Sequence, residues 1–255
     1  LKLEPPAGDP MAQYSALAYA KLHEGILRRS ADLKTEAGQQ LLHNELAQAD
    51  VLITSFRPSA LAKLGLSWSA LHAKYPQLSQ IAIFGALGER AEEPGHDLTY
   101  QAENDLITGL ALPATLYADM GGALATSEAV LQAVLHQRSH STGAYLEVGL
   151  GEAAGYLALP HAWGVTAAGM PVGGGHAGYR VYPCQDGRVA LAALEPHFAL
   201  RLCTAAGIDM PGIETMFEPA THEAVAAFVS TRTRQELDAL AAEKDIPLHT
   251  LSSES

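Results

Sequence analysis

A chain of 255 residues is long enough for one large domain, or for a large domain and a small one. Its 48% hydrophobic and 17% charged residues are typical of a globular protein and exclude a disordered chain. The net charge of -12 argues against general nucleic-acid binding, which needs a basic surface. A few local Arg and Lys side chains can still receive the phosphates of an anionic cofactor.

Two cysteines, Cys184 and Cys203, are present without a CxxC spacing. A disulfide framework is therefore not expected, and a reducing cytoplasm is the simplest location. No apolar run reaches about 18 residues, so no membrane-spanning helix is predicted. The first residues, LKLEPPAGDP, do not read as a signal peptide, and without an initiator Met we expect the natural start to lie upstream.

The N-terminal part of the chain alternates between short apolar strands and helices. Strands are expected at 1–3, 51–54 and 79–84, and helices at 11–27, 36–49, 59–64 and 67–74. Thr35 is placed to cap the helix that follows it. The alternation predicts an α/β fold with a mainly parallel sheet, because the runs at 51–54 and 79–84 read as buried strands. Ligands of such sheets bind beyond the carboxyl ends of the strands, here 55–58 and 85–95.

The composition changes at the glycine-rich segment 170–178, MPVGGGHAG, which predicts a large domain at 1–172 and a small domain at 173–255. Before it, helices are expected at 97–110, 121–138 and 151–168, and a strand at 144–148. After it we expect a hairpin of 179–184 and 188–194, helices at 196–206, 223–229 and 232–243, and a last strand at 246–251. The turn of the hairpin is predicted at Asp186-Gly187.

The segment 94–122 carries proton-active side chains at two predicted helix starts. His96 and Asp97 head one helix, and Asp119 stands directly before the expected start of the other. Free backbone N–H groups at that start would attract an anion near Asp119. His96 and Asp119 are therefore interpreted as two sides of one site, and the alternative is that each is only a polar residue at a helix start.

Six segments occur along the chain in this order: KLEPPAGDPM, DLKTEAG, ADVLITSFRPSALAKLGL, GHDLTY, YADMGG and YRVYPCQDGRVALAALEPHF. The ordered set resembles the family III CoA-transferases of the CaiB/BaiF type, a family that includes α-methylacyl-CoA racemase. Usual members are longer at both ends. The resemblance therefore implies that an opening strand and helix, and a C-terminal segment that returns to the large domain, are missing here.

The resemblance implies a Rossmann-like large domain, a smaller α+β domain, and two chains interlocked as a homodimer. It also implies a coenzyme A thioester as the substrate and, for a transferase, a carboxylic acid as the acceptor. Asp119 matches the nucleophile of CoA transfer. In the racemase branch, His96 and Asp119 match the acid/base pair, and Glu195 matches a residue near the site. The residues implied in binding coenzyme A are Arg28, Arg57, Lys63, Gly85 and Tyr100.

The resemblance leaves CoA transfer and racemisation open, since Asp119 serves either chemistry. A nicotinamide oxidoreductase is disfavoured, because no GxGxxG follows a strand and opens a helix. His136 and His140 have a metal-binding spacing but no third ligand at a recognisable distance, so no metal is expected. A non-catalytic CoA-binding or assembly subunit is the remaining alternative.

Overall fold

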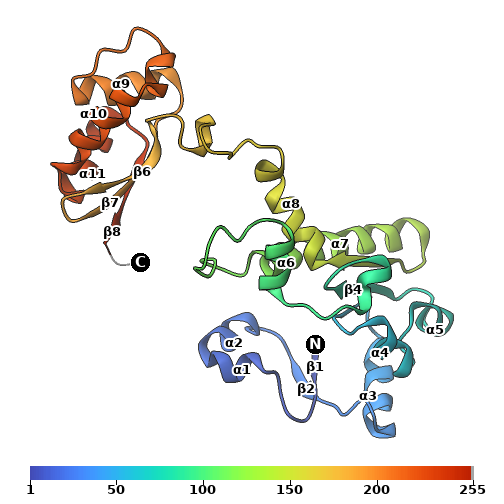
Figure 1. Ribbon diagram of the computed structural model, residues 1–255. Helices are drawn as coiled ribbons and strands as arrows, with labels where there is room; N and C mark the ends of the chain where they lie inside the picture. Colours follow the sequence, from blue (N-terminus) through green and yellow to red (C-terminus); the bar gives the residue numbers. More distant parts are fainter. Residues whose placement is uncertain (254–255) are drawn as a thin grey trace. The chain divides into compact units, whose positions relative to one another are not determined.

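The computed structural model describes residues 1–253 and divides the chain into two compact units, Leu1–Ala158 and Leu159–Ser255 (Figure 1). The first unit contains two sheets and the second unit one, and the hydrophobic core clusters of the two units are separate. The division falls inside helix α8 (Leu150–Ala162), upstream of the glycine-rich segment at which the sequence predicts a boundary. Within residues 1–253, no helix is long and apolar enough to cross a membrane.

The strands of the first unit pair in parallel, which confirms the prediction of parallel sheets. They are β1 (Lys2–Glu4), β2 (Arg28–Ser30), β3 (Val51–Thr54), β4 (Ser79–Phe84) and β5 (Tyr145–Gly149). β1 pairs with β2, and the other three form a sheet in the order β3-β4-β5. Parallel pairing puts the carboxyl ends of these three strands at one edge, where the loops after Thr54 and Phe84 leave the sheet.

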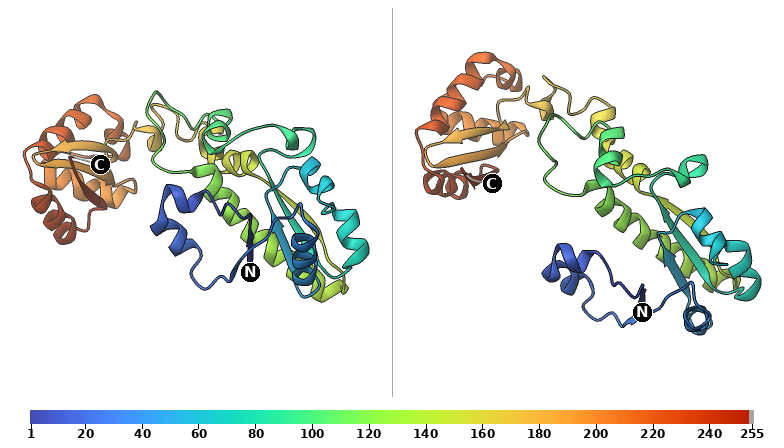
Figure 2. Two further views of the ribbon diagram at one scale, coloured as in Figure 1. Left: turned by 90° about the horizontal axis from the view of Figure 1, so that it is seen from below. Right: turned by 60° about the horizontal axis from the view of Figure 1, so that its bottom comes forward.

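Helices cover both faces of the three-stranded sheet (Figures 1 and 2). The helices of the first unit are α1 (Met11–Tyr14), α2 (Ala16–Leu22), α3 (Glu36–Leu46), α4 (Pro58–Lys63), α5 (Trp68–Lys74), η1 (Gly88–Glu92), α6 (Asp97–Glu103), α7 (Tyr117–His140) and the first part of α8. Phe84 of β4 packs in a cluster with Leu42 of α3 and Leu71 of α5. Ile81, on the opposite face of β4, packs with Ala133 of α7. Alternate residues of one strand thus serve two cores.

Several predicted helices of the first unit differ in extent from the observed ones. The helix expected at 11–27 is two helices, because Ser15 is extended and its hydroxyl caps α2 by accepting the Ala18 N–H at 3.2 Å. The helix expected at 97–110 ends at Glu103, shortly before Asp105 adopts a left-handed φ of 56°. The cap at Thr35 is confirmed, since its hydroxyl accepts the Gly38 N–H at 3.1 Å.

The second unit contains an antiparallel sheet in the order β6-β7-β8, with helices packed on it. Its elements are η2 (Pro171–Gly173), β6 (Tyr179–Cys184), β7 (Gly187–Ala192), α9 (Pro196–Ala206), η3 (Ile213–Phe217), α10 (Pro219–Ser230), α11 (Arg234–Lys244) and β8 (Leu248–Ser252). The predicted hairpin is confirmed, but Cys184 pairs with Gly187, so the turn residues are Gln185 and Asp186. Gly187 instead opens β7, where a Cβ would lie 2.3 Å from the carbonyl oxygen of Leu251.

Candidate active site

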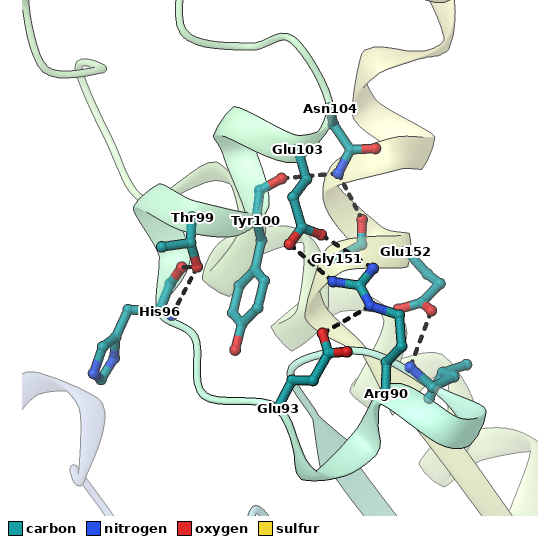
Figure 3. A network of polar contacts seen from close by, with 10 residues as sticks. Arg90, Glu93, His96, Thr99, Tyr100, Glu103, Asn104, Gly151 and Glu152 are labelled. Atoms are coloured by element: carbon teal, nitrogen blue, oxygen red, sulfur yellow. Dashed lines mark hydrogen bonds and ion pairs between the residues drawn. The ribbon is translucent and has the colours of Figure 1, made fainter.

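The start of α6 fixes the backbone of His96 and leaves its imidazole free. His96 is the N-cap residue: its N–H donates to the Thr99 hydroxyl at 3.1 Å, and its carbonyl accepts the Thr99 hydroxyl and N–H, each at 2.8 Å. The residue is exposed, and its imidazole points away from α6 (Figure 3). The side chain is therefore available to a bound molecule.

Asp119 lies inside the first turn of α7, not before it as predicted. The helix begins at Tyr117, so Asp119 is its third residue and lines a pocket of about 350 Å³. The other lining residues are Ile83, Gly122, Ala123, Thr126 and Leu150. Asp119 is an exposed residue, but partial desolvation of its carboxyl by neighbouring atoms and the negative charge of Asp97 raise the pKa of this carboxyl, and the positive charge of His96 opposes the rise. A more basic carboxylate is a better proton acceptor and nucleophile.

A buried carboxylate, Asp97, connects the two helix starts. Its side chain accepts the backbone N–H of Asp119 at 3.1 Å and the side-chain amide of Gln101 at 2.5 Å. Both Asp97 and Gln101 are buried, with exposed fractions of 7% and 0%. Sequence reasoning did not single out this pair. The signal that was available is the i,i+4 spacing of an acid and an amide on one helix.

Tyr100 is buried between the backbones of two glycines. A Cβ at Gly85 would lie 2.1 Å from the Tyr100 hydroxyl, and a Cβ at Gly95 would lie 2.5 Å from its ring. Burial and the charge of Asp119 raise the pKa of Tyr100, and the positive charge of Arg57 opposes the rise. Tyr100 is therefore influenced by two of the charged residues that the sequence assigned to the site.

Polar contacts hold α6 in place beside the loop after β4 and the start of α8 (Figure 3). Arg90 forms ion pairs with Glu93 at 2.8 Å and Glu103 at 2.9 Å. The Asn104 amide donates to the carbonyls of Tyr100 at 2.8 Å and of Gly151 at 3.1 Å. The backbone around Tyr100 is thus fixed from two sides.

The basic residues predicted to bind coenzyme A lie in two places. Arg57 is the N-cap residue of α4, directly after β3, and Lys63 is the last residue of that helix; both are exposed. Arg28 belongs to β2, lies over the Tyr19 ring at 5.1 Å, and lines a second pocket of about 450 Å³. The positive charge of Arg57 acts on Tyr100, which links Arg57 to the region of Asp119.

Glu195 belongs to the second unit. It is the exposed N-cap residue of α9, with Pro196 in the first helical position. That it lies near His96 and Asp119 stays a prediction.

Within residues 1–253, one group of side chains has the composition and spacing of a metal site: Glu4, Asp9 and His23. The ammonium of Lys2 forms an ion pair with Glu4 at 3.2 Å and contacts Asp9 and His23. A cation of the protein itself thus already interacts with these ligands. The rings of His136 and His140 stack at 4.3 Å on α7, where His136 is half-buried and His140 is exposed.

The parallel sheet, with polar side chains at the starts of α6 and α7, defines an α/β protein whose candidate site lies among the loops that leave the sheet. The chain belongs to CoA-transferase family III, whose model matches residues 1–254.

Curated relatives are similar over part of their length. Cinnamoyl-CoA:phenyllactate CoA-transferase of Clostridium sporogenes is 36% identical over 112 residues, which are 39% of this chain and 27% of that protein. Succinyl-CoA--D-citramalate CoA-transferase of Chloroflexus aurantiacus is 34% identical over 62% of this chain and 43% of its own length. Alpha-methylacyl-CoA racemase of Mus musculus is 27% identical over 78% of this chain and 57% of its own length. The chain thus spans less than two thirds of these proteins.

Solved structures show the same fold. A CaiB/BaiF family protein from Brucella suis aligns with a TM-score of 0.79 and 24% identity, over 97% of this chain and 75% of that chain. The hypothetical protein Rv3272 from Mycobacterium tuberculosis aligns with a TM-score of 0.79 and 20% identity, over the same shares of the two chains. At these identities the similarity is one of fold alone.

Proposed function

We propose that the protein transfers coenzyme A between carboxylic acids, with Asp119 as the nucleophile. The observation that carries the proposal is the setting of Asp119, a carboxylate of raised pKa in the first turn of α7 that lines a pocket. Family membership and relatives that are named CoA-transferases support a thioester substrate.

The reaction proceeds through successive covalent intermediates at the Asp119 carboxyl, first an acyl anhydride and then a CoA thioester. The carboxylate attacks the thioester carbonyl, the C–S bond breaks, and an acyl-aspartyl anhydride and CoA thiolate result. The thiolate attacks the aspartyl carbonyl, which releases the first carboxylate and leaves an aspartyl-CoA thioester. The acceptor carboxylate attacks this thioester, forms a new anhydride, and expels the thiolate. The thiolate then attacks the new acyl carbonyl, which gives the product thioester and regenerates Asp119.

The residues around Asp119 suit this chemistry. As a residue of the first turn of α7, Asp119 is at the positive end of the helix dipole, which favours the negative charge that develops on the carbonyl oxygen. Arg57 and Lys63 are assigned to the phosphates of coenzyme A, because both are exposed cations, Arg57 in the loop that leaves β3 and Lys63 at the end of α4. Gly85 and Tyr100 are assigned to the wall along which the cofactor lies, and Arg28 to a more distant contact.

A second candidate is racemisation of a 2-methylacyl-CoA, favoured by the nearness of a basic group to Asp119. His96 acts on the charge of Asp119 and has a free imidazole, so the two can exchange protons with opposite faces of an α-carbon. Glu195 is assigned to the support of His96 in this reaction. Similarity to a protein named alpha-methylacyl-CoA racemase over 78% of the chain supports this second candidate.

Trapping and isotope exchange separate the two reactions. The chain is incubated with succinyl-CoA, a panel of carboxylic acids and hydroxylamine, which converts an acylated Asp119 to a hydroxamate that peptide mass spectrometry locates. Asp119→Asn is expected to lose transfer by on the order of 10³-fold and to form no hydroxamate. Deuterium from heavy water at the α-carbon of (R)-2-methylacyl-CoA, without transfer, would favour racemisation. A folded Asp119→Ala variant with unchanged acyl-CoA activities would leave only the binding or assembly role.

The proposal includes a homodimer of Rossmann-like chains in the cytoplasm, divided functionally at 172/173. α7 supports the dimer, because Met120, Leu124, Leu131 and Leu135 lie on one face of the helix and are all exposed in the single chain. Sedimentation equilibrium is expected to give twice the mass of the chain, and Leu124→Glu with Leu131→Glu is expected to lower it to that of one chain.

A further inference from the structure

We propose that Asp97 is a positioning residue, a buried carboxylate that holds the backbone of Asp119 in place from another helix. The inference rests on the proposed function only in taking Asp119 as the reacting carboxylate. It starts from the finding that one buried carboxylate lies at the start of α6 and binds the start of α7.

The N-terminus of α7 has no cap of its own. Leu116, its N-cap residue, has an apolar side chain and makes no side-chain hydrogen bond to the helix. The N–H groups of a first helical turn have no partner within the helix. The N–H of Asp119 finds one in the Asp97 carboxylate, at 3.1 Å. Asp97 therefore caps α7 from another helix, and the contact is made at the residue whose side chain reacts.

The second oxygen of Asp97 is held as firmly as the first. Gln101 donates its amide to Asp97 at 2.5 Å and to the Thr115 carbonyl at 3.4 Å. Both partners are acceptors, which fixes the amide orientation and leaves the Gln101 carbonyl oxygen buried without a partner. The side-chain amide of Gln101 therefore cannot rotate without losing its hydrogen bonds to Asp97 and Thr115. Asp97 thus transmits the position of α6 to the backbone of Asp119.

The same carboxylate acts on the charge of Asp119. Partial desolvation is the largest cause of the raised pKa of Asp119, and the negative charge of Asp97 raises it further. Asp97 also follows His96 directly in the chain, so the residue that fixes Asp119 is joined to the residue on the other side of the site. One buried side chain therefore links the backbones that carry the two predicted reacting groups.

Three variants of the full chain test this role. Asp97→Asn keeps the size and one acceptor oxygen but removes the charge, and Asp97→Ala removes the contact as well. Asp105→Asn is the matched control, because it removes an exposed carboxylate two positions after α6, and Asn tolerates the left-handed backbone there. The pKa of Asp119 is read from the carbon-13 signal of its carboxyl, assigned with Asp119→Asn, which requires no activity.

The expected results differ among the variants. Asp97→Asn lowers the pKa of Asp119, and the acid limb of the kcat profile moves to lower pH; Asp105→Asn moves neither. Asp97→Ala lowers the pKa of Asp119 too, frees its amide to exchange faster with solvent, and lowers kcat by about 10²-fold with little change in KM, because the reacting group is misplaced. If Asp97→Ala does not fold, Gln101→Met, which keeps the charge, is expected to lower kcat without lowering the pKa of Asp119.

An unchanged pKa of Asp119 in Asp97→Asn, or unchanged amide exchange of Asp119 in Asp97→Ala, would overturn the proposal. Failure of the proposed function is a different result, in which the pKa of Asp119 shifts as expected while Asp119→Ala retains every acyl-CoA activity.

Discussion

Replacing Gly85 by alanine is expected to destabilise the first unit through Tyr100. The added Cβ would lie 2.1 Å from the Tyr100 hydroxyl and 2.8 Å from the carbon that bears it, both closer than side chains pack. The ring cannot retreat, because Gly95 bounds it as well, with a Cβ position 2.5 Å from the ring. Overpacking of this kind costs about 1–3 kcal/mol. For a protein of this size the melting temperature falls by roughly 2–4 °C per kcal/mol, hence by roughly 2–12 °C.

The assay is thermal unfolding followed by circular dichroism, with Gly109→Ala as the matched control. Nothing lies within 4 Å of a Cβ at Gly109, and its φ is not positive, so the change there is expected to stay within about 0.5 kcal/mol. In a Tyr100→Phe background the nearest atom is gone, and Gly85→Ala is expected to cost less. Equal melting temperatures for Gly85→Ala and Gly109→Ala, or the same loss with Phe at position 100, would refute the contact.

Two further predictions concern the second unit. His176 is 2% exposed, and its Nδ1 accepts the Gly178 N–H at 3.0 Å. Burial and the neighbouring His222 lower the pKa of His176 in the folded protein. As pH falls below about 6.5, this imidazole is therefore protonated first in the unfolded chain, which lowers the stability of the folded protein. The urea midpoint of unfolding is therefore expected to decrease when the pH is lowered from 7.5 to 5.5. His176→Asn, which keeps an acceptor but does not titrate, is expected to show a smaller decrease. An equal decrease in both proteins would contradict this role of His176. Thr233→Ala removes the capping box of α11 and is expected to cost about 1 kcal/mol in urea unfolding, against a smaller loss for Thr231→Ala, whose exposed hydroxyl donates to the Phe228 carbonyl and accepts from Arg232 but caps no helix.

Elements whose signals are local could be predicted from the sequence. The strands β3 and β4 are at the predicted residues. The prediction of burial holds for β4, the middle strand, but not for β3, an edge strand whose Ile53 is 51% exposed. The cap at Thr35 and the hairpin of β6 and β7 follow from residues within one turn of the backbone. These features are determined by residues adjacent in the sequence, so they can be predicted from it.

Elements that depend on distant partners could not be predicted in the same way. α7 begins at Tyr117 because Asp97, from another helix, accepts an N–H of its first turn, and no residue beside Tyr117 signals this. β2 is a short, exposed run of polar residues that becomes a strand only by pairing with β1. Tertiary contacts decide such boundaries.

The candidate site shows the same division. The residue types at positions 96 and 119 stand out in the sequence, and both lie at helix starts in the structure. The sequence also contains Asp97 and Gln101, but their role depends on their burial and on contacts between α6 and α7 that only the structure shows. Whether Glu195 joins the site remains a prediction.

The order of strands in the parallel sheet has a consequence for biosynthesis. β4 is the middle strand, and its second neighbour, β5, leaves the ribosome only after the whole of α7 has been made. Until then one edge of β4 has no partner, and the face that carries Ile81 has no cover. A parallel sheet of this kind forms through distant pairings and therefore assembles late. A nascent chain halted before Tyr145 is thus expected to hold an open, apolar strand edge, which is the kind of segment that chaperones bind.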